Sequence, residues 1–111
     1  MINNRFKEEF EVYRQEWIED QNGFESSELD YSHEFKGLMQ QTSPEDTEFL
    51  NLSFNQSFTI FCPLNTDIKS TDIVLYDGWE YGVRNIIDYT DGINKHKQVY
   101  LEKLDEKVIG S

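Results

Sequence analysis

The chain has 111 residues, with 22 acidic against 10 basic side chains and a formal net charge of −12. That length supports one domain with a single modest core, and the charge disfavours ordinary phosphate-neutralising binding to nucleic acid or anionic lipid. The 8 Phe, 6 Tyr and 2 Trp residues exclude a disordered chain, and no apolar run approaches the about 20 residues that would span a membrane.

Residues 1–7 are mostly polar and are expected to form a flexible arm, without the apolar segment of a secretory signal. From residue 6 to residue 18 the pattern supports two structures. Aromatic residues recur at helical spacing, and the stripe would contain Phe6, Phe10, Tyr13 and Trp17. However, Phe10-Glu11-Val12 alternates as a strand does, and residues 20–23 (DQNG) suit a hairpin turn. We favour strand, turn and strand, and the helix remains the alternative.

Another strand is expected over residues 33–41, HEFKGLMQQ. It follows a polar and acidic stretch that begins at residue 26, where Leu29 and Tyr31 alternate with polar side chains. Phe35 and either Leu38 or Met39 would face the core, whereas Gly37 would interrupt the alternation as a β-bulge.

Residues 42–56 begin with a helix-start pattern. Ser43 suits the N-cap, Pro44 the first helical position, and Asp46 places negative charge near the positive end of the helix dipole. Residues 48–54 could extend such a helix by one or two turns. The alternative is a long mobile loop between strands, which would be functional in a domain this small.

Residues 57–62, SFTIFC, predict a central strand because apolar side chains occupy both of its faces. Pro63 would end the strand, since proline cannot donate a hydrogen bond to the next strand. Residues 65–71 then turn back towards the following hairpin, and Ile68 is expected to plug the core.

Asp77-Gly78 predicts a β-hairpin with a two-residue type I′ turn, in which both positions need positive φ. The turn fixes the register and sets Tyr76 opposite Trp79, Leu75 opposite Glu80, Val74 opposite Tyr81 and Asp72 opposite Val83. One face would carry the apolar set that anchors the core: Val74, Tyr76, Trp79, Tyr81 and Val83. The mixed face would meet a partner or a second layer of the same domain, and it would carry Ile73, Leu75, Glu80, Gly82 and Arg84.

The second hairpin strand continues to residue 89, with a bulge expected near Arg84-Asn85 where the alternation slips. Residues 90–95 form a turn, residues 97–104 a last strand, and residues 105–111 a short frayed tail. Together these elements predict a mainly β single domain over residues 1–111. Residues 8–104 would form a small antiparallel β-barrel or sandwich of about six strands, with one short helix or a long loop excursion.

Few residues are candidates for chemistry. His33 and His96 fit no metal-ligand spacing, and Cys62 has the apolar neighbours of an inert packed thiol in a reducing compartment. Carboxylates are so frequent that a catalytic pair cannot be selected, and glycine-rich phosphate-binding and GxSxG patterns are absent. We therefore expect neither an enzyme nor a bound metal or cofactor.

The order of patterns carries a resemblance. A strand that contains Gly37-Leu38 is followed by a variable insertion, a Thr-containing strand, the spacing D-I-x-x-x-x-G-x-x-Y-x-V and a closing strand. The residues at the spaced positions are Asp72, Ile73, Gly78, Tyr81 and Val83. Over residues 33–104 this resembles the small head–tail joining proteins of tailed bacteriophages, the head-closure or stopper components of the neck. The chain departs from many relatives at residues 61–63, where Phe-Cys-Pro replaces an arginine.

The resemblance implies a β-barrel subunit of a homo-oligomeric ring in the virion neck, made in the bacterial cytoplasm. The ring would contact the portal or adaptor protein and the tail-end protein, retain packaged double-stranded DNA, and let DNA pass without sequence-specific binding. The residues assigned to a channel or gating loop are Thr42, Ser43, Pro44, Glu45, Asp46, Thr47, Glu48, Phe49, Asn51, Asn55 and Gln56. Those assigned to the subunit interface are Ile73, Leu75, Glu80 and Arg84. Those assigned to a structural role as motif residues are Asp72, Gly78, Tyr81 and Val83.

Other functions remain open. An acidic protein can mimic DNA and block a host nucleic-acid-binding protein, and a tail-completion or terminator component would share the barrel but dock elsewhere. The charge alone does not choose, because acids suit a DNA mimic, a channel wall that repels phosphate, or a merely solvated surface.

Overall fold

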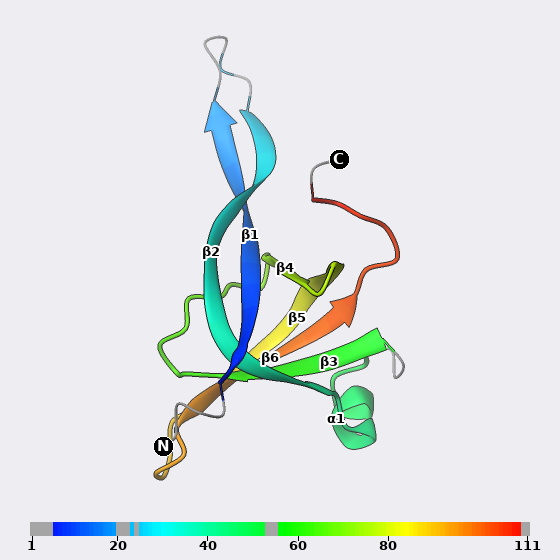
Figure 1. Cartoon of the computed structure of the whole chain (residues 1–111). Coiled ribbons are helices and arrows are strands. Elements are labelled where there is room, and N and C mark those ends of the chain that lie inside the picture. The colour runs from blue at the N-terminus through cyan, green and yellow to red at the C-terminus, as the bar shows by residue number, and fades with distance from the viewer. Residues whose placement is uncertain (1–5, 20–22, 24, 53–55, 110–111) are drawn as a thin grey trace.

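The computed structural model describes residues 6–19, 23, 25–52 and 56–109. Its six strands form one antiparallel sheet that closes into a barrel in the order β1-β2-β3-β6-β5-β4 (Figure 1). This confirms the mainly β fold and selects the barrel over the sandwich. The elements are β1 Glu8–Glu19, β2 Glu25–Gln41, α1 Pro44–Phe49, β3 Ser57–Cys62, β4 Ile73–Tyr76, β5 Trp79–Tyr89 and β6 His96–Lys103.

The core fills the inside of the barrel and draws on every strand. Phe10 and Val12 are fully buried, and the Phe10 ring lies 5.3 Å from the Phe35 ring and 4.6 Å from the Tyr76 ring. Because Phe10 and Val12 alternate with outward acids, residues 8–19 form a strand, and the helical alternative is wrong. The other buried core side chains are Ile60, Cys62, Ile68, Val74, Tyr81, Val83, Val99 and Leu101.

Strands β1 and β2 extend beyond the rest of the barrel as a two-stranded hairpin, which Figure 1 shows rising above the other strands. β1 pairs with β4 only at residues 11–13, and β2 pairs with β3 only at residues 38–41. Among the described strands, residues 14–19 and 25–30 therefore pair only with each other, and we call them the projection. β2 is one 17-residue strand, so the strand expected after the turn and the separate strand expected over residues 33–41 are continuous. The expected turn at residues 20–23 lies outside the described residues except for Gly23.

The β4–β5 hairpin has the expected register, with Tyr76 opposite Trp79 and Val74 opposite Tyr81. Asp77 and Gly78 have φ values of 52° and 79°, as a type I′ turn requires. Trp79 is the exception to the expected core face, because its side chain is 52% exposed. The strand beside it, β6, pairs with β5 only from Tyr81 onward, and the Lys103 ammonium of β6 lies over the Trp79 ring, 3.4 Å from its centroid.

The two expected bulges have different outcomes. The register between β5 and β6 slips between Val83 and Asn85, which confirms the second bulge. The first is wrong, because Gly37 pairs regularly with Glu8 and the irregularity between β1 and β2 falls between Val12 and Tyr13. Gly37 is instead a point of close packing: a Cβ there would lie 2.8 Å from both Ile60 Cγ2 and the Phe61 carbonyl oxygen.

The helix-start pattern at Ser43 is confirmed. The Ser43 hydroxyl accepts a hydrogen bond from the Asp46 N–H at 3.2 Å, Pro44 opens α1, and the helix ends at Phe49. In the part of the chain that the model describes, no helix has the length and apolar character needed to cross a membrane.

Candidate functional site

The residues considered for chemistry lie apart and are used locally. The His33 ring contacts the Asp67 carbonyl oxygen, and the His96 ring contacts the Asn94 carbonyl oxygen. Cys62 is fully buried, and burial raises the pKa of its thiol. Within the described ranges, no three His, Cys, Asp or Glu side chains could together hold a metal ion. The candidate functional features of the described residues are therefore surfaces of the barrel.

The expected gating segment, residues 42–56, is partly folded onto the barrel. Thr42 is 2% exposed, its N–H donates to the Ser57 carbonyl oxygen, and its hydroxyl lies 3.0 Å from the Thr59 hydroxyl. Thr47 is also buried and donates to the Ser43 carbonyl oxygen. Asp46 is half-buried and Asn55 lies outside the described residues, whereas the exposed members are Ser43, Pro44, Glu45, Glu48, Phe49, Asn51 and Gln56.

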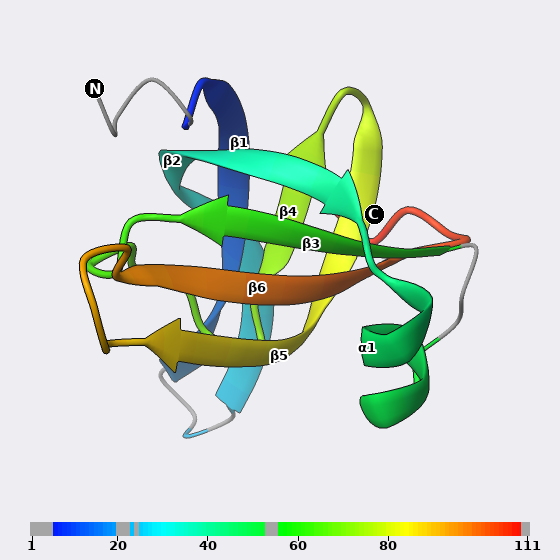
Figure 2. The same ribbon diagram turned by 90° about the horizontal axis from the view of Figure 1, so that it is seen from below.

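Helix α1 covers one end of the outer face formed by β2, β3 and β6 (Figure 2). Tyr100 points outward from β6, away from the core, yet it is only 2% exposed. Burial, together with the nearby Asp46 carboxylate, raises the pKa of the Tyr100 hydroxyl. Ser57 and Thr59, which alternate with the core residues of β3, are buried on the same outer face. This end of the outer face therefore behaves as a second small core.

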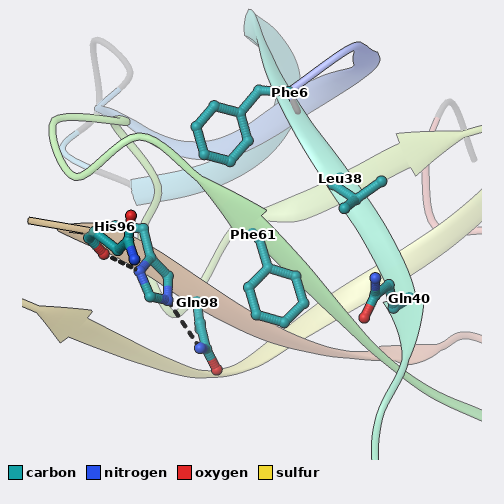
Figure 3. Close-up of a pocket in the computed structure, with 7 residues that line it drawn as sticks. Phe6, Leu38, Gln40, Phe61, His96 and Gln98 are labelled. Carbon is teal, nitrogen blue, oxygen red and sulfur yellow. Dashed lines mark hydrogen bonds between the residues drawn. The ribbon is translucent and has the colours of Figure 1, made fainter. Parts of the chain in front are cut away.

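The other end of that outer face is open and holds a cavity of about 370 Å³. Leu38, Phe61 and Gln98 form one cross-strand row over β2, β3 and β6. Figure 3 shows them beside His96, whose Nε2 accepts a hydrogen bond from the Gln98 amide N–H at 2.9 Å. The cavity, which we call the outer pocket, is lined by Phe6, Leu38, Gln40, Phe61, Asn94, His96 and Gln98.

The outer pocket was not predicted from the sequence, although the apolar residues on both faces of residues 57–62 pointed to a covered outer surface. Phe6, expected in a flexible arm, is 8% exposed at the edge of this pocket. The rest of that arm, apart from Lys7, lies outside the described residues.

The mixed face of the β4–β5 hairpin is only partly available to a partner. Glu80 is 6% exposed, and one of its carboxylate oxygens accepts the N–H groups of Val108 and Ile109 at 2.7 and 3.0 Å. The chain therefore covers Glu80 with its own tail. The expectation of a frayed tail is wrong for residues 108 and 109, whose N–H groups are bonded to Glu80. Ile73 and Leu75 are half-buried, and Arg84 pairs with Glu102 at 3.3 Å.

The motif residues have structural places. Asp72 is 1% exposed and accepts two hydrogen bonds of 2.9 Å from the Arg14 guanidinium and one of 2.8 Å from the Lys69 N–H. Arg14 also contacts both carboxylate oxygens of Asp67, which holds the pKa of Asp67 below its usual range. Arg14 was not singled out in the sequence; the feature that could have identified it is a lone base in an acidic strand.

Acidic residues are concentrated in the β1–β2 hairpin. β1 contains five acids and one base, and β2 contains four acids and one base, so together they hold nine acids against Arg14 and Lys36. The hairpin that extends farthest from the barrel is thus strongly acidic in sequence.

Comparisons with known proteins identify the fold. No family model and no curated protein matches the chain. Among solved structures it is similar to protein SF1141 from Shigella flexneri 2a, with a TM-score of 0.77 and 13% identity over 96% of this chain and all of that one. It is also distantly similar to the protein xkdH of the phage-like element PBSX from Bacillus subtilis, at a TM-score of 0.48 and 13% identity over 86% of this chain and 92% of that one. The first similarity shows a shared barrel fold; the second is too low to support an argument.

Proposed function

We propose that the chain is a head-closure ring subunit of a tailed bacteriophage, with a structural rather than a catalytic role. The observation that carries the proposal is the place of the residues on which the resemblance rests. The five residues of the spaced motif lie in or next to the β4–β5 hairpin, which closes the barrel between β1 and β6, and the variable insertion is the 42–56 segment between β2 and β3.

The structure gives the spaced positions physical reasons. Gly78 takes the positive φ of the turn, Tyr81 and Val83 fill the core, and Asp72 fixes the entry to the hairpin by binding Arg14 and the Lys69 N–H. A pattern that specifies this hairpin specifies the closure of the barrel. The outer surfaces of the barrel can then differ between proteins that share this hairpin and the closed barrel.

The acidic surface supports a role as a DNA conduit. Carboxylates on a channel wall repel phosphate, so DNA would pass without adhering. The gating role of residues 42–56 stays a prediction, and it has a defined cost: movement of the whole segment would break the Thr42 contacts with Ser57 and Thr59.

Removal of the gene from its phage tests the proposal. We expect filled heads that lose their DNA and do not receive tails, and supply of the protein in trans should restore infectious particles. Particles of normal composition and infectivity would contradict a head-closure role. If ejection through the ring depends on acids that line its channel, charge reversal of such an acid should slow DNA ejection. Charge reversal of an acid on the outer rim should leave the ejection rate unchanged.

A second candidate, the DNA mimic, is favoured by the acidic β1–β2 hairpin. A projecting hairpin with an acidic sequence could enter a basic groove that normally holds phosphates. Here the phage that lacks the gene would still build tailed particles and would fail later, inside the host. Particle morphology therefore separates the two functions.

A further inference from the structure

The outer face of β2, β3 and β6 is covered at one end and open at the other. Along β3, the outward residues Ser57 and Thr59 are buried and bonded to Thr42, two residues before α1, but the next outward residue, Phe61, faces the outer pocket. The helix joins β2 at Gln41, three residues and about 10 Å from the Leu38 row. Among the described residues, one half of this outer face is therefore covered and the other half, at the outer pocket, is open.

The open half has the size and composition of a docking pocket. Its volume of about 370 Å³ lies within the range of about 300–1,000 Å³ that is typical of specific binding pockets. Two phenyl rings and a leucine side chain provide apolar walls, and the remaining lining residues are Gln40, Asn94, His96 and Gln98. None of the seven lining residues is acidic, in a chain with more than twice as many acids as bases.

Phe49 is the complementary feature. It ends α1 and is 84% exposed, although the helix itself is capped by Ser43 and anchored by the buried Thr47. The same helix carries the acids Glu45, Asp46 and Glu48 and no base, so a partner surface without acids can approach it without like-charge repulsion. Aromatic residues, phenylalanine included, are enriched at the buried centre of protein interfaces, and here the ring is held outward on an anchored helix.

We propose that Phe49 of one copy of this chain inserts into the outer pocket of a second copy. The contact is head-to-tail, because α1 lies at one end of β3 and β6 (Figure 2), whereas the pocket residues Phe61, His96 and Gln98 belong to the other end of these strands. Repetition of a head-to-tail contact closes a ring when the rotation between copies allows it. The inference thus deepens the proposed ring and rests on it, and it places the tip of α1 between subunits instead of assigning it the gating role.

Charge supports the direction of the contact. Lys95 is exposed between the lining residues Asn94 and His96, where the Glu45 and Glu48 carboxylates of an incoming α1 can reach it. Lys36 lies two residues before Leu38 on the same outward side of β2, but it faces Glu9 across the strand pair and contributes less.

Formation of a mixed disulfide tests the contact between Phe49 and the outer pocket while both the Phe49 phenyl ring and the pocket are kept. One chain carries Glu48→Cys next to Phe49, and a second chain of different mass carries Gln40→Cys at the pocket; both positions are exposed. The native Cys62 is fully buried and should not react. Under mild oxidation we expect the mixed dimer to exceed both homodimers, either for the free protein or once the portal protein is added.

Two further variants identify the side chain responsible. Phe49→Ala in the Glu48→Cys chain should lower the rate of mixed-dimer formation about tenfold or more. In the same Glu48→Cys chain, whose own pocket is not part of the cross-linked contact, Ile93→Ala removes an apolar side chain that is 91% exposed and should leave the rate unchanged. Homodimers only, the same yield after Phe49→Ala, or no cross-link with or without portal would each overturn the inference.

The test is independent of the proposed function. If the mixed dimer forms but the phage does not need the gene for head closure, the contact is correct and the proposed function is wrong. A gene that is essential for head closure, encoding a protein that assembles on portal without this cross-link, would do the reverse.

Discussion

Two hairpins of this barrel, β1–β2 and β4–β5, are held in different ways. The β4–β5 hairpin has a four-residue first strand, a type I′ turn at Asp77-Gly78, and barrel partners on both sides. The β1–β2 hairpin has strands of 12 and 17 residues and pairs with the barrel only over short segments. The β4–β5 hairpin is specified by its turn, whereas the β1–β2 hairpin is held mainly by tertiary contacts far from its turn.

Those tertiary contacts lie along β1. The Glu8 carboxylate accepts hydrogen bonds from the Tyr76 hydroxyl and from the Met39 N–H. The bond from the Tyr76 hydroxyl raises the pKa of Tyr76 to about 12. Phe10 packs in the core, and Arg14 binds Asp72 and Asp67. The comparison therefore predicts that changes along β1 affect the whole barrel, while changes at the tip of the projection do not.

The largest effect is expected for Phe10→Ala. Phe10 is fully buried between two other rings, so its truncation should lower the free energy of unfolding by about 3–5 kcal/mol. Urea denaturation followed by tryptophan fluorescence measures the loss. The neighbouring Glu9→Ala, at an exposed position, should change stability by no more than about 0.5 kcal/mol. Equal effects of the two would contradict the assignment of β1 to the core.

Asp72→Asn should follow, with a loss of about 2–3 kcal/mol. The change removes one charge from a buried pair and leaves the Arg14 guanidinium, whose side chain is only 18% exposed, with Asp67 alone. Amide exchange should rise in residues 14–19 and 25–30 more than at the β4–β5 turn. A uniform rise would show that Arg14 and Asp72 do not hold the projection in particular.

A matched glycine pair separates the two turns. Gly78 and Gly23 have the same φ of 79°, and at both positions a Cβ would meet no atom within 4 Å. Gly78→Ala should therefore cost about 1 kcal/mol of global stability through backbone strain. Gly23→Ala should leave the global transition unchanged, because the end of the projection can lose its pairing without opening the barrel. Equal shifts in the denaturation midpoint would contradict this difference.

The smallest effect concerns pH. Because Arg14 lowers the pKa of Asp67 in the folded state, this pair stabilises the protein above the ordinary carboxyl pKa of about 4, and that stability is lost as the pH falls through the folded value. Asp67 is 63% exposed, so the contribution is about 0.5 kcal/mol or less. Stability curves from pH 7 to pH 2 should show a slightly weaker acid dependence in Asp67→Asn. A steeper dependence would contradict the sign.

The same contrast explains what the sequence could predict. Turn chemistry and alternation are local, so the register of β4–β5, the cap at Ser43 and the bulge after Val83 were accessible. The continuity of β2 from residue 25 to residue 41 and the regular pairing of Gly37 depend on which strands meet across the barrel, and no local pattern contains that information. Arg14 and the outer pocket join residues that are distant along the chain, and for this reason they emerged only from the structure.

The central claim is that this barrel functions as one copy in a ring on a portal. Native mass spectrometry of the portal assembly with and without the protein tests it most directly. The account predicts a single added mass that equals a fixed whole number of 13.2 kDa chains, the same number in every assembly. No added mass, or a variable number of chains that changes with protein concentration, would contradict it.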